Sequence, residues 1–169
     1  MSRCWRTACM SCRNSWATAR LFADPEAKAL IAGLDLDGSV DALVRLYVAG
    51  ICGLGYGLRQ IIAAQQAKGI ETGTVVVSGG AGQSPLVRRL LADTTGLTVA
   101  APATAEPVLL GSAMLGAVAA GLQPNLEAAM AAMSAVGETY RPGGGAMEAY
   151  HAKRFEGFEL LQSVGRRLR

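Results

Sequence analysis

The chain has 169 residues, a formal net charge of +3 and 51% hydrophobic residues. This composition fits a single globular domain with a sizeable core and argues against a disordered chain. Aromatic residues make up only 5% of the chain and basic residues form no stripe among them, so the sequence gives no support to a nucleic-acid-binding function.

The first twenty residues differ in pattern from the rest of the chain. Residues 1–20 show no period of 2 or 3.6 and hold three of the four cysteines. Cys9 and Cys12 have the C-x-x-C spacing of a zinc or redox pair, but no second pair follows and the one histidine, His151, is distant. We therefore expect no metal site. We interpret residues 1–20 as a non-native or disordered extension and residues 21–169 as the folded domain.

The expected location is cytoplasmic. No apolar run of the kind found in signal peptides follows the first arginines, and the cysteine pattern does not require an oxidising compartment.

A turn at Phe22–Pro25, a short helix at Glu26–Ile31 and a loop at Gly33–Gly38 are expected next. Asp35 and Asp37 resemble the start of a calcium loop, but the later ligands of that motif are missing. We favour helix capping by Asp37 or Ser39, with Asp41 in the first helical turn.

The helix that follows is long, and Lys68 and Gly69 are expected to close it. Its apolar residues repeat at spacings of three and four, and Cys52 is expected to be one of its core residues. Four glycines inside the helix predict that another helix approaches closely: Gly50, Gly53, Gly55 and Gly57.

A strand, a glycine turn and a helix are predicted around residue 79. Val75–Val77 is typical of a buried strand, since valine packs well on a pleated surface. Glycines 79, 80 and 82 permit positive φ and leave main-chain amides open to a ligand, while Gln83 or Ser84 caps a helix that starts at Pro85. The turn matches neither the dinucleotide fingerprint nor a P-loop, so a plain strand-to-helix connection and a ligand site both stay open.

A second strand is predicted at Gly96–Ala100, parallel to the first if the two are neighbours. Pro107 begins a helix to Gly121 that is rich in small residues; it is too short for a membrane span, so we expect it to be tightly buried.

Two more helices complete the chain. One runs from Pro124 through Met133 and ends at Gly137, followed by an extended piece and a flexible link at Gly143–Gly145. The last covers Ala146–Arg169 with an apolar side formed by Tyr150, Phe155, Phe158 and Leu161.

Three motifs in this order resemble the C-terminal lobe of the FGGY family of carbohydrate kinases. They are VSGGAGQSPL at Val77–Leu86, ADTTGLTV at Ala92–Val99 and EPVLLGSA at Glu106–Ala113. Ala128–Gly137 and Tyr150–Phe155 are similar to the ribulokinase branch, which phosphorylates pentuloses.

The resemblance implies an α/β fold, namely the C-terminal lobe of an actin-like (ribonuclease H-like) ATPase fold, partial and helix-rich. It implies the ATP-binding lobe of a sugar kinase that acts on a pentulose such as ribulose, with ATP and Mg²⁺ as cofactors. The family's glycine turn lines the adenine and ribose part of the ATP site, and by position this turn corresponds to Gly79, Gly80, Ala81 and Ser84.

The chain also departs from the family. The N-terminal lobe, its phosphate-binding turn and the catalytic aspartate precede the matched region, so the resemblance gives no catalytic residue and no metal ligand. We expect a truncated lobe that is inactive alone, or alternatively a non-catalytic fragment or interaction module that keeps the fold without binding ATP. The missing lobe or self-association is the expected partner, and no nucleic acid or membrane is expected.

The reading frame offers an interpretation of residues 1–20. At the position of Asn14–Arg20 the family carries the segment Leu-Gly-Asn/Glu-Arg-Ser-Pro. Asn14–Arg20 can be encoded by synonymous codons that, read in the neighbouring frame, give Glu-Phe-Leu-Gly-Asn-Arg-Ser. We predict that a single-nucleotide insertion shifted the frame of a longer kinase gene. An unrelated extension is the alternative.

Overall fold

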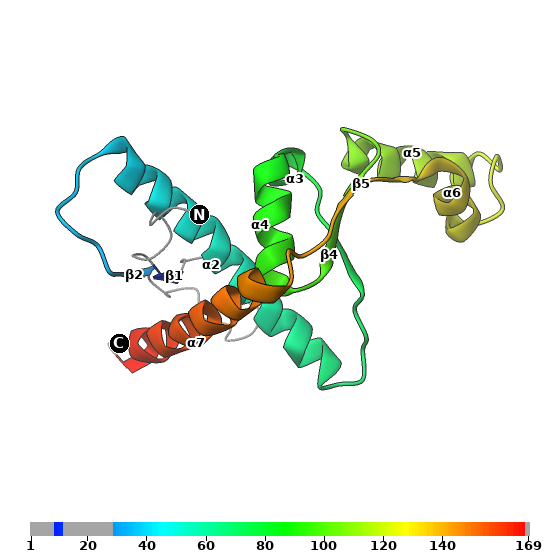
Figure 1. Ribbon diagram of the computed structural model, residues 1–169. Helices are drawn as coiled ribbons and strands as arrows, with labels where there is room; N and C mark the ends of the chain where they lie inside the picture. Colours follow the sequence, from blue (N-terminus) through cyan, green and yellow to red (C-terminus); the bar gives the residue numbers. More distant parts are fainter. Residues whose placement is uncertain (1–8, 12–28, 168–169) are drawn as a thin grey trace. The chain divides into compact units, whose positions relative to one another are not determined.

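The computed structural model describes residues 9–11 and 29–167 (Figure 1). They fall into two compact units, each described separately. In its described residues, unit 1 comprises 9–11, 29–72, 90–96 and 142–167, and unit 2 comprises 73–89 and 97–141. The helix α4 (Pro85–Thr95) contributes its first residues to unit 2 and its last residues to unit 1.

Unit 1 is built around α2 (Val40–Gln66), the expected long helix. Ser39 is its N-cap, because the Ser39 hydroxyl accepts a hydrogen bond from the Ala42 N–H at 3.2 Å. At the other end Gly69 has φ +79° and the Ile70 N–H bonds back to the Gln65 carbonyl at 3.0 Å, which ends the helix with a left-handed glycine. The predicted Ser39 cap and the Gly69 end are confirmed, whereas the last turn of α2 contains no basic residue and Lys68 lies beyond it.

A close approach to α2 explains one of its glycines. A Cβ added at Gly55 would overlap the Thr94 hydroxyl and lie 2.8 Å from the Thr94 Cβ, so the end of α4 packs directly on the α2 backbone. Thr94 is fully buried and donates its hydroxyl proton to the Leu90 carbonyl at 2.7 Å. The helix predicted to approach α2 is therefore α4, and Cys52 is buried in α2 as expected.

An aromatic cluster joins α2 to α7 (Gly145–Arg167). Tyr56 packs against His151, Phe155 and Phe158, with ring centroids 5.7 to 6.0 Å away. The Tyr56 hydroxyl and His151 Nδ1 are hydrogen-bonded at 2.8 Å, and both side chains are buried. The sequence placed the phenylalanines in the apolar side of this helix but gave the histidine no role in the core.

The start of α7 is held by Asp93. The Gly143 N–H donates to Asp93 Oδ1 at 2.8 Å, and Gly144 and Gly145 have φ values of +60° and +51°. The glycines at 143–145 thus form a defined turn where a flexible link was predicted.

Two short strands lie in the segment before α2. Strand β1 (Cys9–Ser11) pairs antiparallel with β2 (Leu30–Ala32). The helix predicted at Glu26–Ile31 is wrong for Leu30 and Ile31, because both residues pair with β1 across a sheet ladder. Residues 12–28, which include Cys12 and the turn at Phe22–Pro25, lie outside the described residues. The proposed boundary at residue 20 stays a prediction, although a three-residue strand lies inside the predicted extension.

Unit 2 holds a three-stranded sheet of order β3-β4-β5. Strands β3 (Thr74–Val76) and β4 (Thr98–Pro102) are parallel, as predicted, and β5 (Val136–Tyr140) is antiparallel to β4. The central strand β4 is the buried one, with Val99 and Ala100 fully covered.

Two predictions for this sheet are wrong. Strand β3 is an edge strand with Val76 60% exposed, so its valines do not form a buried strand among the described residues. Gly137 lies within β5 and does not end a helix; a Cβ there would lie 3.1 Å from the Pro102 carbonyl oxygen, so close strand packing favours the glycine.

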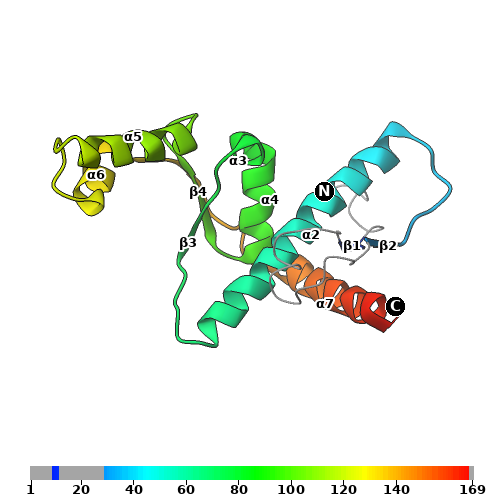
Figure 2. The same cartoon turned by 180° about the vertical axis from the view of Figure 1, so that it is seen from behind.

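A helical pair follows the sheet. Helices α5 (Pro107–Ala119) and α6 (Leu126–Met133) lie side by side in both views (Figures 1 and 2). Asn125 caps α6 by accepting from the Ala128 N–H at 2.8 Å. The predicted burial of α5 is wrong, since Met114 is its buried residue while Val108 and Leu109 are 78% and 65% exposed. Within unit 2, α6 covers only part of a helix that is apolar on every side.

Among the described residues, α2 is long and apolar enough to cross a membrane by length and composition. Its central residues are buried in unit 1, and core helices of soluble proteins pass the same test, so this finding carries little weight.

Candidate functional site

A cavity of about 270 Å³ opens at the carboxyl ends of β3 and β4 in unit 2. Ligands of α/β proteins commonly bind beyond the carboxyl ends of parallel strands, where loops leave the sheet. Four segments form the wall: the turn after β3, helix α4, the end of β4 with the loop that follows it, and the start of α5. The lining residues are Val77, Ser78, Gly79, Gly82, Gln83, Arg88, Ala101, Pro102, Ala103, Thr104, Ala105 and Pro107.

The turn after β3 is shaped by two glycines with different tasks. Gly79 has φ +80°, a conformation that L side chains rarely adopt, and it turns the chain from the strand into the short helix α3 (Gly80–Gln83). A Cβ at Gly82 would lie 2.6 Å from the Val77 carbonyl oxygen, so Gly82 lets α3 fold back onto the end of the strand. The Val77 N–H continues the ladder by bonding to the Ala100 carbonyl at 2.9 Å.

The four predicted site residues have different positions. Gly79 lines the cavity, whereas Gly80 and Ser84 are not among its described lining residues, and the side chain of Ala81 lies outside what the structure describes. A Cβ added at Gly80 would meet nothing within 4 Å. Ser84 caps α4, because its hydroxyl accepts from the Val87 N–H at 3.5 Å, and Pro85 is the first residue of that helix as predicted. The assignment of these four residues to a ligand stays a prediction.

The sequence reasoning missed several lining residues. Ser78, Gln83 and Thr104 bring a hydroxyl or amide group to the cavity wall. The first two adjoin the predicted glycines, so the signal for them was the same turn. Thr104 lies after β4, and the parallel pairing of β3 and β4 was the signal that both strand ends share one site.

Arg88 is the only charged residue in the described lining, and its surroundings were not predictable from local sequence. Its side chain is 10% exposed and forms an ion pair with Glu138 at 3.2 Å. The guanidinium carbon lies 4.9 Å from the centre of the Tyr140 ring. The Tyr140 hydroxyl donates to Glu138 at 2.8 Å, and this hydrogen bond to the carboxylate is the main cause that raises the pKa of Tyr140.

The chemistry of this cavity is that of binding. Its described lining offers main-chain groups, hydroxyls, one amide and one guanidinium, and it contains no carboxylate, imidazole or thiol. Such a wall hydrogen-bonds a polar ring or a sugar, but it has no group suited to take a proton from a substrate.

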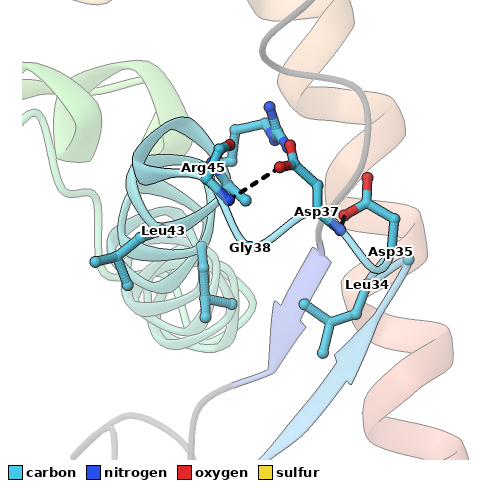
Figure 3. A pocket seen from close by; sticks show the side chains of 10 residues that line it. Leu34, Asp35, Asp37, Gly38, Leu43 and Arg45 are labelled. Atoms are coloured by element: carbon cyan, nitrogen blue, oxygen red, sulfur yellow. Dashed lines mark hydrogen bonds and ion pairs between the residues drawn. The ribbon is translucent and has the colours of Figure 1, made fainter.

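A second pocket of about 350 Å³ lies in unit 1 between the loop after β2 and the start of α2 (Figure 3). Leu34, Asp35 and Asp37 come from the loop, and Leu43 and Arg45 from the helix. Asp37 pairs with Arg45 at 2.8 Å and accepts from the Ser39 N–H at 2.9 Å. These contacts, led by the bond to Arg45, lower the pKa of Asp37 to about 2. Of the two predicted caps Ser39 is the one observed, and Asp37 has a structural role through Arg45 and the Ser39 N–H.

Asp93 is likewise structural, since it receives the Gly143 N–H. Over residues 9–11 and 29–167, no three His, Cys, Asp or Glu side chains come together as metal ligands.

Comparison with known proteins gives a family match. The model of the FGGY family of carbohydrate kinases, C-terminal domain, matches residues 13–120. An FGGY carbohydrate kinase domain-containing protein from Xenopus laevis is 38% identical over 142 residues, which cover 84% of this chain and 26% of that protein. A D-ribulokinase from Saccharomyces cerevisiae is 37% identical over 99 residues, 58% of this chain and 14% of the relative. The chain thus spans about a quarter or less of the length of these relatives.

Solved structures agree on the fold. The xylulose kinase from Rhodospirillum rubrum has a TM-score of 0.68 at 21% identity, covering 86% of this chain and 29% of the kinase. Glycerol kinase from Plasmodium falciparum, solved with ADP, has a TM-score of 0.67 at 18% identity and covers 94% of this chain and 30% of its own. The predicted fold, the C-terminal lobe of an actin-like ATPase in a helix-rich form, is confirmed.

Proposed function

Because the chain belongs to the FGGY family of carbohydrate kinases, we propose that it is the ATP-binding part of a sugar kinase. The complete reaction transfers the γ-phosphate of ATP to a hydroxyl group of a pentulose such as ribulose. The observation that carries the proposal is the cavity at the carboxyl ends of β3 and β4, lined by Gly79. An adenosine group suits such a wall, since a glycine backbone permits close approach and Ser78, Gln83 and Thr104 offer hydrogen bonds.

The choice of a pentulose rests on relatives. One relative is named a D-ribulokinase and several structural neighbours are named xylulose kinases, which act on five-carbon ketoses by name. Others are named glycerol kinase and gluconate kinase, so the family as a whole supports a polyhydroxylated acceptor and the nearer branch supports the pentulose.

We propose further that the chain is inactive alone. Phosphoryl transfer depends on positioning, on magnesium and on a group that accepts the hydroxyl proton. The described lining of the cavity has no such acceptor and no carboxylate that could hold magnesium. Mg²⁺ therefore enters the proposal only as the partner of ATP in the complete kinase, and the rest of the kinase is the proposed partner of this lobe in the cytoplasm.

Filling the cavity tests the nucleotide assignment. Ala105 lines the cavity and is exposed, so Ala105→Trp blocks it without a buried change. We expect calorimetry to show ATP-analogue binding by the wild-type chain and a loss of at least tenfold in the variant, on the scale of lost pocket contacts. The matched control is Ala63→Trp, an exposed position on α2 that does not line the cavity. Equal affinities for the wild type and Ala105→Trp contradict the assignment.

A non-catalytic interaction module is the second candidate. The exposed apolar side chains of α5, such as Val108 and Leu109, favour it because uncovered apolar surface marks a contact site. A chain that binds no nucleotide but associates through α5 would support this candidate instead.

A further inference from the structure

Arg88 is buried with one of its hydrogen-bonding atoms unused. Its side chain is nine-tenths covered, and Nε is buried with no hydrogen-bond partner among the described residues. Within the described part of the chain its guanidinium forms one ion pair, with Glu138 at 3.2 Å, and the Glu138 side chain is 68% exposed. The guanidinium carbon also lies over the Tyr140 ring, 4.9 Å from its centre.

Structural stability does not account for this arrangement. An ion pair whose carboxylate is mostly in water contributes little to stability, while a buried guanidinium with an unused donor is costly. A hydrophobic residue on α4 would cover Tyr140 without that cost. The charge at this position therefore has a task apart from packing.

Another part of the lining of the same cavity also favours negative charge. Ala105 and Pro107, at the start of α5, line it, and Glu106 makes no side-chain cap to the helix. An uncapped N-terminus of a 13-residue helix presents free N–H groups and the positive end of the helix dipole.

We propose that the cavity contains an anion subsite, in which Arg88 and the α5 N-terminus bind a phosphoryl group. Glu138 and Tyr140 hold the guanidinium in place while the subsite is empty. The most direct source of the bound phosphoryl group is a nucleotide, and to that extent the inference rests on the proposed nucleotide function. The subsite also binds inorganic phosphate, because the same protein groups recognise it.

Three probes of the full chain test the subsite by calorimetry: adenosine, AMP and inorganic phosphate. We expect AMP to bind more tightly than adenosine, and phosphate alone to bind weakly. Arg88→Met should lower AMP and phosphate affinity by roughly ten- to a hundredfold, the range for hydrogen bonds to charged groups, and should lower adenosine affinity much less. Arg89→Met is the matched control, since Arg89 is exposed and next to Arg88 on the same helix but does not line the cavity.

A second variant separates binding from folding. Glu138→Gln keeps an oxygen acceptor for Arg88 but removes the competing carboxylate, so phosphate should bind more tightly than to the wild type. A purely structural role predicts no gain. If phosphate binds but AMP binds no more tightly than adenosine, the subsite is supported and its ligand is a free anion. The subsite is overturned if Arg88→Met retains full phosphate and AMP affinity, or if the wild-type chain binds no anion. If the wild-type chain binds phosphate but not adenosine, the nucleotide function is overturned and the subsite stands.

Discussion

Single residues of this chain show where local sequence is sufficient and where it is not. Gly79 was predicted from its turn, and its φ of +80° agrees with the reason given. Arg88 was missed because its partners, Glu138 and Tyr140, lie about fifty residues further along the chain and reach it only through the sheet. His151 was missed for a similar reason, since its partner is Tyr56 on another helix.

His151 makes the stability of unit 1 sensitive to pH. Its pKa is lowered mainly by burial, and Arg59 and Arg154 lower it further while Asp93 opposes them. Near its ordinary pKa of 6.5 the unfolded chain binds more protons than the folded chain. The free energy of unfolding should therefore fall as the pH drops through 6.5, until the folded-state pKa is passed and both states carry the proton.

Denaturant unfolding between pH 7.5 and 5 measures this effect, and the chain's single histidine gives one assignable NMR titration. His151→Gln should flatten the pH dependence in this range. Tyr56→Phe, which removes only the hydroxyl, should lower stability by about 1 kcal/mol at each pH. If the free energy of unfolding of the wild type rises as the pH falls, the assignment of a lowered pKa to His151 is contradicted.

Elements were predicted well where their ends carry their own signals. The caps of α2, α4 and α6 lie at Ser39, Ser84 and Asn125, residues whose side-chain oxygens accept main-chain N–H groups nearby. Burial was predicted poorly for β3 and α5, because an apolar sequence indicates that an element is to be covered but does not say which segment covers it. Gly137 was predicted to end a helix but lies in β5, because a glycine alone does not distinguish a helix end from a position in a strand.

Helical glycines separate into two classes that substitution can distinguish. Gly55→Ala places a Cβ against Thr94 and should destabilise the protein by about 1 to 3 kcal/mol through overpacking. Gly116→Ala in α5 meets nothing within 4 Å and should stabilise the isolated chain by up to about 1 kcal/mol, the helix propensity difference. Urea unfolding of both variants is the measurement. Equal effects of the two substitutions would show that the packing of α4 on α2 does not require the glycine.

At the scale of the whole molecule, the chain has more apolar surface than its own elements cover. Leu109, Leu115 and Leu122 are each more than 60% exposed, and all three lie in or directly after α5. The Xenopus laevis relative is about three times as long as this chain, since the 142 matched residues are 84% of this chain and 26% of that protein. An uncovered apolar helix face of this kind marks a contact surface.

The isolated chain should therefore associate with itself through α5. A second copy offers the same apolar helix, so two copies can cover each other through a symmetric contact without any new chemistry. We expect sedimentation velocity to show that the mass of the wild type increases with concentration. The double variant Leu109→Lys and Leu115→Lys should shift the population toward monomer, because each lysine would be buried without a partner in the contact. The control is Leu160→Lys, which changes a similarly exposed leucine on α7 in the other unit and should leave association unchanged. A wild-type chain that stays monomeric at all concentrations, with no surface that binds a hydrophobic dye, would mean that the exposed face of α5 is stable in water and needs no partner.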